Sequence, residues 1–297
     1  FKDGKPSYRL KAPEALVILD GKQIELINGV TMTALDDFGQ VLTSEKATWR
    51  PDDELLFLEG NPVAKNQKQQ LRADTSTYSA LHDTLTLTGN VVMKSWQNGI
   101  QDGQRADTTI YSPFAQWNSR TGDLVVKGPL SGYQLADGGK VRILTATSAK
   151  GNSNNEWLDF VKPVKVVEPL DNLLVESGTI RWWYNLGKLS TQSSVSGTFR
   201  DLVVTGVGLD INTSDKSIHV KSTCQLIQPG ESLEANTCYW NWGTGSVKAK
   251  GSVLLKRDEL NQTTKAEILN GIATKDGRVV FASPEKQVKT ELQLSEP

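Results

Sequence analysis

A short strand phrase recurs along this chain, and it limits the fold more than any other feature. The phrase alternates apolar and polar residues, has a small residue in the middle and ends on further apolar positions. Leu85 to Met93 is the clearest copy, and others span residues 56–63, 124–130, 158–164, 218–224 and 247–255. A period of two is typical of a β-strand with one buried face. The repeats therefore predict an all-β fold built from similar hairpins.

Each clear copy follows a segment that runs from an alanine to an aromatic residue, as in Ala73–Tyr78 and Ala106–Tyr111. Such a hairpin cannot bury its apolar face alone, whereas stacked copies can. We therefore expect an elongated stack of antiparallel hairpins forming one domain over residues 1–297, with two lobes, about 1–170 and 171–297, as the alternative division. Short helices are expected only within Gly4–Leu16 and Lys256–Ile272.

The small residue of the phrase is a glycine at Gly60, Gly89, Gly128 and Gly251. Glycine weakens a strand, so its place in the inward row indicates a bend or a close approach of another backbone. One bend per hairpin, in register, would fold the sheet along its length and leave an apolar trough inside. A simple β-bulge is the alternative.

The phrase Ala…Tyr…Leu-x-Leu-x-Gly-Asn-Val, clearest from Ala73 to Met93, resembles the repeat of the lipopolysaccharide-export (OstA-like) family, which includes LptA, LptC and the periplasmic domain of LptD. The later phrase Gly206–Asp210, followed by Ile218-His219-Val220, resembles LptC in particular. The resemblance covers about residues 20–255 and implies an open β-jellyroll, or β-taco. The length of the chain fits a long LptC form of the kind expected in cyanobacteria.

The resemblance also implies a function, a location and partners. It implies a non-catalytic protein that receives lipopolysaccharide or a related glycolipid from an inner-membrane ABC exporter of the LptB, LptF and LptG kind. The lipid would pass to an LptA-like β-jellyroll that adds to a free strand edge. The location implied is the periplasm, with an N-terminal helix in the inner membrane. Because Phe1 is not an initiating methionine, we expect that a signal or anchor segment precedes it.

Acyl chains need a dry groove, because each methylene exposed to water costs about 0.8 kcal/mol. Gly206 and Gly208 are not groove residues but candidates for a contact with a partner protein. A closed core is the alternative for the inward apolar row. The side chains expected to line the groove are Leu56, Leu58, Leu85, Leu87, Val91, Met93, Leu124, Val126, Leu158, Phe160, Val247 and Val253.

The cysteines Cys224 and Cys238 flank Pro229-Gly230, a turn signal between two strand-like runs. They are either bridged as roughly opposite positions of one hairpin or simply two small buried side chains.

A group of aromatic residues in the second half of the chain consists of either core residues or sugar-stacking contacts. The aromatic residues in question are Trp182, Trp183, Tyr184, Tyr239, Trp240 and Trp242.

Charge and motifs argue against several function classes. A formal net charge of -1 disfavours a nucleic-acid partner, which needs a basic face. With His82 and His219 as the only histidines and no nucleophile elbow or phosphate loop, we expect no catalysis, metal or cofactor. Three alternatives stay open: a soluble LptA-like bridge, a β repeat that binds or cleaves polysaccharide, and a structural β repeat that binds no lipid.

Overall fold

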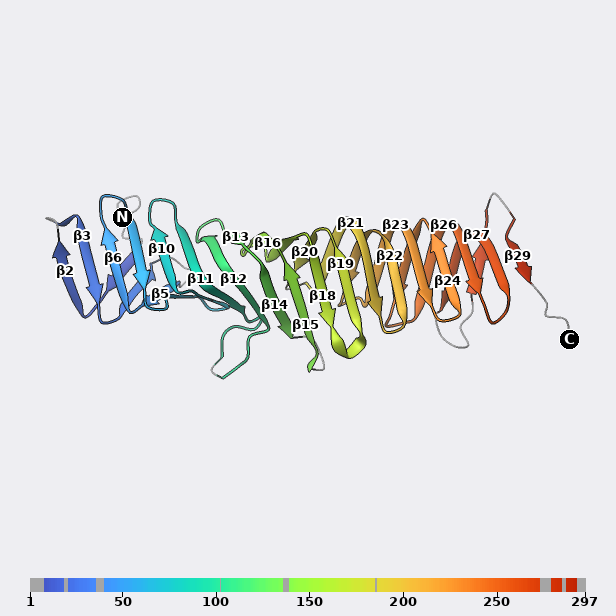
Figure 1. The fold of residues 1–297 in the computed structure, drawn as a ribbon, viewed down its shortest axis with the longest axis horizontal. Coiled ribbons are helices and arrows are strands. Elements are labelled where there is room, and N and C mark those ends of the chain that lie inside the picture. The colour runs from blue at the N-terminus through green and yellow to red at the C-terminus, as the bar shows by residue number, and fades with distance from the viewer. Residues whose placement is uncertain are drawn as a thin grey trace. The chain divides into compact units, whose positions relative to one another are not determined.

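The computed structural model describes residues 8–18, 21–35, 40–101, 103–135, 139–184, 186–272, 279–284 and 287–292. The chain divides into two compact units, residues 1–156 and residues 157–297. In Figure 1 the first unit runs from blue to green and the second from green to red. The secondary-structure elements of the described residues are antiparallel strands, apart from a 3-10 turn at Pro169–Asp171, so the predicted all-β fold of antiparallel hairpins is confirmed.

The first unit consists of two layers of strands. Layer 1A runs in the order β2 (Glu14–Ile18), β3 (Gln23–Ile27), β6 (Lys46–Arg50), β7 (Leu55–Glu59), β10 (Thr75–Ser79), β11 (Thr84–Ser95), β12 (Thr108–Asn118), β13 (Asp123–Lys127) and β16 (Ser148–Asn152). Layer 1B runs in the order β1 (Tyr8–Lys11), β4 (Val30–Ala34), β5 (Val41–Ser44), β8 (Val63–Lys65), β9 (Gln69–Arg72), β11, β12, β14 (Leu130–Leu135) and β15 (Val141–Ala146).

The second unit repeats this plan with longer strands. Layer 2A runs in the order β17 (Trp157–Val161), β20 (Ile180–Trp183), β21 (Lys188–Phe199), β22 (Leu202–Asn212), β23 (Ser217–Gln228), β25 (Thr237–Asn241), β26 (Ser246–Arg257), β27 (Gln262–Ile272) and β28 (Val279–Ala282). Layer 2B runs in the order β18 (Val164–Glu168), β19 (Leu173–Ser177), β21, β22, β23, β24 (Glu231–Ala235), β26, β27 and β29 (Lys289–Leu292).

The long strands belong to both layers of their unit because each one bends in the middle. In β11, residues 84–88 pair with β10 in layer 1A, and residues 92–95 pair with β9 in layer 1B. The register between β11 and β12 shifts between Thr88 and Val91, where Gly89 has a φ of 74° and Asn90 a φ of 40°. The strand is thus bent by a bulge, and the two explanations offered for the glycine describe one feature.

The bend glycines are needed for space as well as for backbone conformation. A Cβ at Gly89 would lie 2.4 Å from Oδ2 of Asp74, and one at Gly60 would lie 2.5 Å from Cβ of Glu45. Gly128 meets Pro113 in the same way. Each bend therefore packs against a neighbouring bend, and together they form the crease where the two layers of a unit meet.

The alternating rows point into the space between the layers. Leu85, Leu87, Val91 and Met93 are all buried, as expected of one strand face. Tyr78 and Trp117 join them in the core of the first unit. This core accounts for the hydrophobic residues that the repeats place at every second position.

Both expected helices are wrong. The described part of Gly4–Leu16 contains β1 and the start of β2, and Lys256–Ile272 contains the end of β26 and all of β27. In β27 the inward positions are Thr264 and Ala266 before the bend and Leu269 after it, opposite Leu255, Val253 and Ala249 of β26. The bend moves the inward row by one residue, so the spacing of apolar positions no longer has a strict period of two.

Candidate functional site: an open groove in the second unit

A groove of about 710 Å³ lies between the two layers of the second unit, toward its C-terminal strands. Its volume falls in the range of about 300–1,000 Å³ usual for ligand sites. The apolar strand side chains that line it come from both layers: Phe199, Leu202, Leu226, Leu233 and Leu255 from layer 2B, and Trp240, Val247, Leu269, Ile272 and Val279 from layer 2A. Pro229 and Leu260 add to the lining from turns.

The floor of the groove is buried and its walls are partly exposed. Leu233, Leu255 and Leu269 are 6%, 4% and 3% exposed, and they close the groove toward the crease. Leu202 and Leu226 are half-buried and turn their side chains into the groove, whereas their neighbours Val203 and Ile227 are 39% and 40% exposed. The strand period of two thus places one apolar row in the groove and the next residue outside it.

An aromatic contact spans the interior at the groove. The ring of Phe199, at the end of β21 in layer 2B, lies 5.7 Å from the ring of Trp240 in β25 of layer 2A. Trp240 in turn lies 6.3 Å from Trp242, again measured between ring centroids. No lining residue of the groove precedes Phe199 in the described part of the chain, so this pair lies at the end of the groove toward the start of the unit.

Beyond this contact, toward the start of the second unit, the interior contains other aromatic side chains. Phe160 stacks on Trp182 at 6.2 Å, and Trp182 meets Tyr184 edge-on at 5.8 Å. Phe160 is fully buried and Trp182 is 7% exposed. These two residues therefore belong to a packed core.

The rim on the layer 2B side carries charges of both signs. Nε of Arg257 lies 2.8 Å from Oε1 of Glu231, and the Arg200 guanidinium lies 5.2 Å from the centre of the Phe199 ring. Asp201 and Glu259 add two more carboxylates to the lining. Each of these residues lies in or next to a turn that joins two strands of layer 2B.

A disulfide bond joins Cys224 and Cys238 close to the crease of the second unit. The register differs from that of directly opposite hairpin positions, because Cys224 pairs with Ala235 of β24 and Cys238 pairs with Val220 of β23. Both cysteines are buried, at 2% and 3% exposure. The bond therefore ties the 2B segment of β23 to β25 of layer 2A across the interior.

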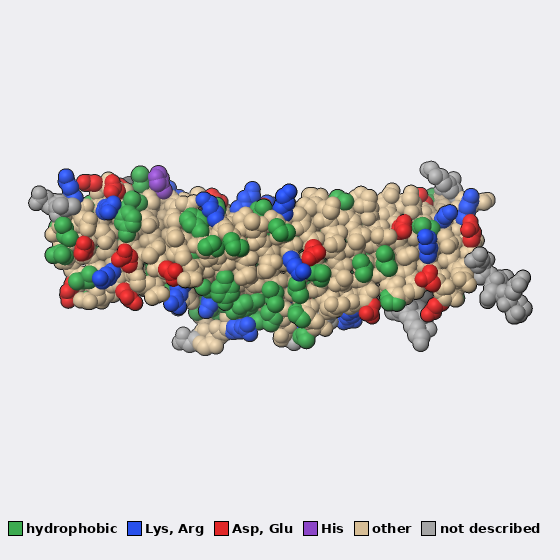
Figure 2. Space-filling view, viewed as in Figure 1, with side chains coloured by type: hydrophobic (Ala, Val, Ile, Leu, Met, Phe, Trp, Pro, Cys, Tyr) green, Lys and Arg blue, Asp and Glu red, His purple; other side chains and the backbone are tan. Residues whose placement is uncertain are grey.

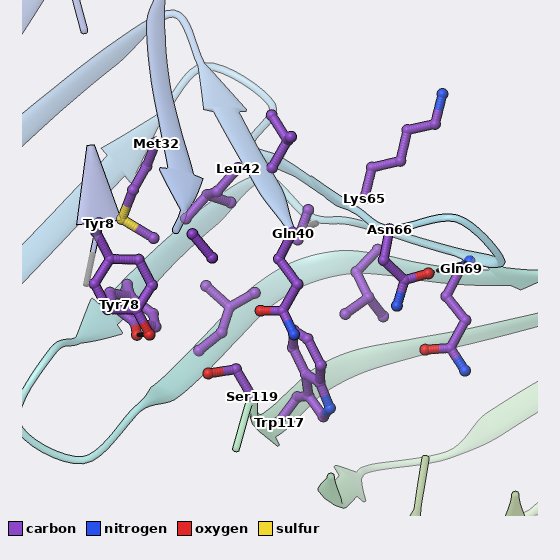
Figure 3. A pocket seen from close by; sticks show the side chains of 15 residues that line it. Tyr8, Met32, Gln40, Leu42, Lys65, Asn66, Gln69, Tyr78, Trp117 and Ser119 are labelled. Atoms are coloured by element: carbon purple, nitrogen blue, oxygen red, sulfur yellow. Dashed lines mark hydrogen bonds between the residues drawn. The ribbon is translucent and has the colours of Figure 1, made fainter. Parts of the chain in front are cut away.

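The corresponding space in the first unit is nearly filled. The space that described residues line there measures about 30 Å³, room for about two water molecules. Figure 3 shows Tyr8 beside Tyr78, with Trp117 and Gln40 also turned toward this space. The first unit thus has a closed core where the second has a groove.

Tyr8 helps to close the first unit at its open edge. Its strand, β1, lies in layer 1B, yet its ring meets Tyr78 of layer 1A edge-on at 5.2 Å. The Tyr78 hydroxyl donates a hydrogen bond to the Tyr8 hydroxyl, which donates to Oδ1 of Asp83 at 3.2 Å. Asp83 also forms an ion pair with Arg120. Burial raises the pKa of both tyrosines, so the hydroxyls stay protonated.

The structure places most of the expected groove residues in the packed core and few of them at an open space. Val247 lines the large groove and Leu85 lines the small space of the first unit. Leu124 is half-buried. The remaining residues are buried, at exposures of 8% or less, and line neither space: Leu56, Leu58, Leu87, Val91, Met93, Val126, Leu158, Phe160 and Val253.

Gly206 and Gly208 occupy the bend of β22. A Cβ at Gly206 would lie 2.4 Å from Cγ1 of Val220, and Gly208 has a φ of 72° beside Lys221. Both glycines are thus explained by the backbone of the bend. A partner contact at these positions stays a prediction.

Sequence reasoning missed most of the groove lining. Leu202 and Leu226 lie in strands whose alternation is visible in the sequence, in Leu202-Val203-Val204 and Gln225-Leu226-Ile227. For Trp240 the sequence indicates only a core or sugar-stacking residue. Alternation identifies inward residues, but it carries no signal for whether another side chain fills the space opposite them.

The histidines stand apart from the groove. His82 is exposed in the turn before β11, and His219 is exposed on β23. Within the described ranges, no group of three or more His, Cys, Asp or Glu side chains is placed to hold a metal ion. No helix among the described residues has the length and apolar character needed to cross a membrane.

Comparison with known proteins gives little further guidance. No family model matches the chain, and no curated protein matches it. Among solved structures it is similar to LptH of Pseudomonas aeruginosa, described as the LptA-homologous periplasmic component of the lipopolysaccharide transport device. That match has a TM-score of 0.20 and 11% identity, and it covers 60% of this chain and 79% of that chain. These values are too low to support a fold or a function.

Proposed function

We propose that this protein is a non-catalytic carrier that holds the acyl chains of lipopolysaccharide or a related glycolipid in the groove of its second unit. The observation that carries the proposal is the open groove itself, with a buried leucine floor and half-buried apolar walls. Left empty, such walls expose apolar surface to water, at a cost of about 25 cal/mol for each Å². An acyl chain between the layers removes that surface from water together with its own.

The repeat phrase supports a place for this carrier in the lipopolysaccharide-export family. We propose a periplasmic, LptC-like role, with an inner-membrane anchor and delivery of lipid from an ABC exporter to an LptA-like partner. The edge strands favour partners that add a strand. Within the described residues β2 pairs with β3 alone, and its Leu16 and Val17 are 55% and 61% exposed. Exposed apolar edge strands are normally protected, so a partner strand is expected there.

Photocrosslinking tests the carrier proposal directly. A photoreactive phenylalanine is placed at Leu226 or Leu202, inside the groove, and in matched variants at the outward neighbours Ile227 and Val203. We expect lipopolysaccharide to crosslink to the inward positions only. Equal crosslinking at inward and outward positions, or none in a folded protein, would overturn the proposal.

Fractionation of the full-length protein tests the finer role. An LptC-like protein should sediment with inner membranes and resist extraction by salt. Recovery in the soluble periplasmic fraction would instead identify an LptA-like bridge. Replacing Val17 with proline should weaken capture of an LptA-like partner, whereas Leu81→Ser, at an exposed turn, should leave it unchanged.

A further inference from the structure

The charged rim of the groove limits which head group fits there. Five charged side chains among the described residues line the groove: Arg200, Asp201, Glu231, Arg257 and Glu259. They come from three successive turns of layer 2B, between β21 and β22, β23 and β24, and β26 and β27. Carboxylates outnumber guanidinium groups, so this described part of the rim has a net negative charge. Figure 2 shows Lys or Arg and Asp or Glu side chains interspersed over β24–β27 on the face in view.

Arg257, one of the two arginines at the rim, already forms an ion pair. Arg257 donates from Nε to Oε1 of Glu231 at 2.8 Å, and the two side chains are 31% and 30% exposed. Oε2 of Glu231 accepts a second hydrogen bond, from the Gln228 amide at 2.9 Å. A phosphate that approached Arg257 would lie beside the Glu231 carboxylate and would compete with it for the guanidinium.

The other cation of the rim is Arg200, in the turn between β21 and β22. Arg200 lies over the Phe199 ring, and Asp201 follows it directly in the chain. Each arginine of this rim thus has a carboxylate close by, in space for Arg257 and in the chain for Arg200, and this disfavours bidentate binding of a phosphate. A sugar hydroxyl suits this rim better, because it donates to carboxylates and accepts from guanidinium groups.

We propose that the groove selects glycolipids whose head group carries no phosphate. This inference rests on the proposed function, because it assumes that acyl chains occupy the groove with the head group at the layer 2B rim. The class of ligand is then an acylated sugar with free hydroxyl groups.

The test compares two lipids that differ only in phosphate. Bisphosphorylated lipid A and the same lipid after enzymatic removal of both phosphates compete for crosslinking at Leu226 in the otherwise unchanged protein. We expect the phosphate-free lipid to bind about tenfold more tightly at about 50 mM salt. The difference should shrink as salt screens the rim.

Variants of the rim carboxylates test whether these groups cause the preference for the phosphate-free lipid. Glu231→Gln should improve binding of the phosphorylated lipid most, because it releases Arg257 as well as removing a negative charge. Glu259→Gln should improve it less. Glu234→Gln, on the outward face of the same strand β24, should leave both affinities unchanged.

The possible results separate this inference from the proposed function. Equal or tighter binding of the phosphorylated lipid would overturn the inference and leave the carrier proposal in place. The same holds if Glu231→Gln has no more effect than Glu234→Gln. If neither lipid binds to the folded protein, the carrier proposal itself fails.

Discussion

Phe199 and Trp240 meet across the interior of the second unit, one from each layer, with 5.7 Å between their ring centroids. Both side chains line the groove. The contact therefore limits how far a ligand chain can extend between the layers. It also links two strands, β21 and β25, that are distant in sequence.

Replacing Trp240 with alanine should lengthen the groove and destabilise the second unit. Removing a large aromatic side chain from a packed site costs about 3–5 kcal/mol, and a half-buried ring should cost somewhat less. Urea unfolding gives the stability, and crosslinking efficiency with lipids of increasing acyl length gives the groove length. Tyr239→Ala, whose side chain points to the other face of β25, is the control. An unchanged preference for acyl length would contradict the assigned role of the contact.

Loss of the disulfide should loosen the two layers at the crease. The bond closes a loop with a sequence separation of 14 residues, and a loop of this length corresponds to about 3 kcal/mol of stabilisation. The double variant Cys224→Ala, Cys238→Ala should unfold at lower urea and lose all response to reducing agent. The parent protein treated with reductant should shift to the same midpoint. A parent that shows no response under conditions that reduce the bond would count against this expectation.

The tyrosine pair predicts loss of stability at high pH. Burial and the hydrogen bond to Tyr8 raise the pKa of Tyr78 above its unfolded value near 10. A raised pKa means that the unfolded chain releases its proton first. The stabilising effect is therefore complete below about pH 10 and is lost as pH rises toward the folded value.

Urea midpoints measured from about pH 8 to pH 11 test this sign. The parent should lose stability above about pH 10, and Tyr78→Phe should lose less over the same range because it has no proton to release. Tyr133→Phe is the control, since the side chains of Thr109 and Arg105 hold the pKa of Tyr133 below its ordinary value despite some burial. A Tyr78→Phe profile as steep as that of the parent would contradict the assignment.

Two glycines with nearly the same backbone angle allow the stability cost of backbone strain to be measured apart from the cost of steric crowding. Gly89 and Gly103 have φ values of 74° and 77°, yet a Cβ at Gly89 would strike Asp74 while one at Gly103 would meet nothing within 4 Å. Gly103→Ala should cost about 1–2 kcal/mol from the left-handed backbone alone. Gly89→Ala should cost clearly more, because Asp74 must move away from its 2.9 Å hydrogen bond with Asn90. Equal losses in the two variants would show that the bend tolerates a side chain.

Much of the fold could be predicted from single strands. The row Leu85, Leu87, Val91 and Met93 is buried as its alternation indicates, and Gly89 lies at a bend as its place in that row suggests. The helix expected over Lys256–Ile272 failed because the bend in β27 shifts the inward row from Thr264 and Ala266 to Leu269. A shift of one residue at a bulge removes the strict period on which strand recognition depends.

Which residues face inward can mostly be predicted from the sequence, because alternation in a strand is a local property of neighbouring side chains. Whether the inward space is filled depends on the packing of the two layers. In the first unit Tyr8 of β1 reaches Tyr78 of β10 and closes the open edge, while in the second unit Leu202 and Leu226 of layer 2B lie across an open groove from Val247 of layer 2A. Those partners come from strands far apart along the chain. The volume between them depends on how far apart the two layers stand, which no single strand specifies.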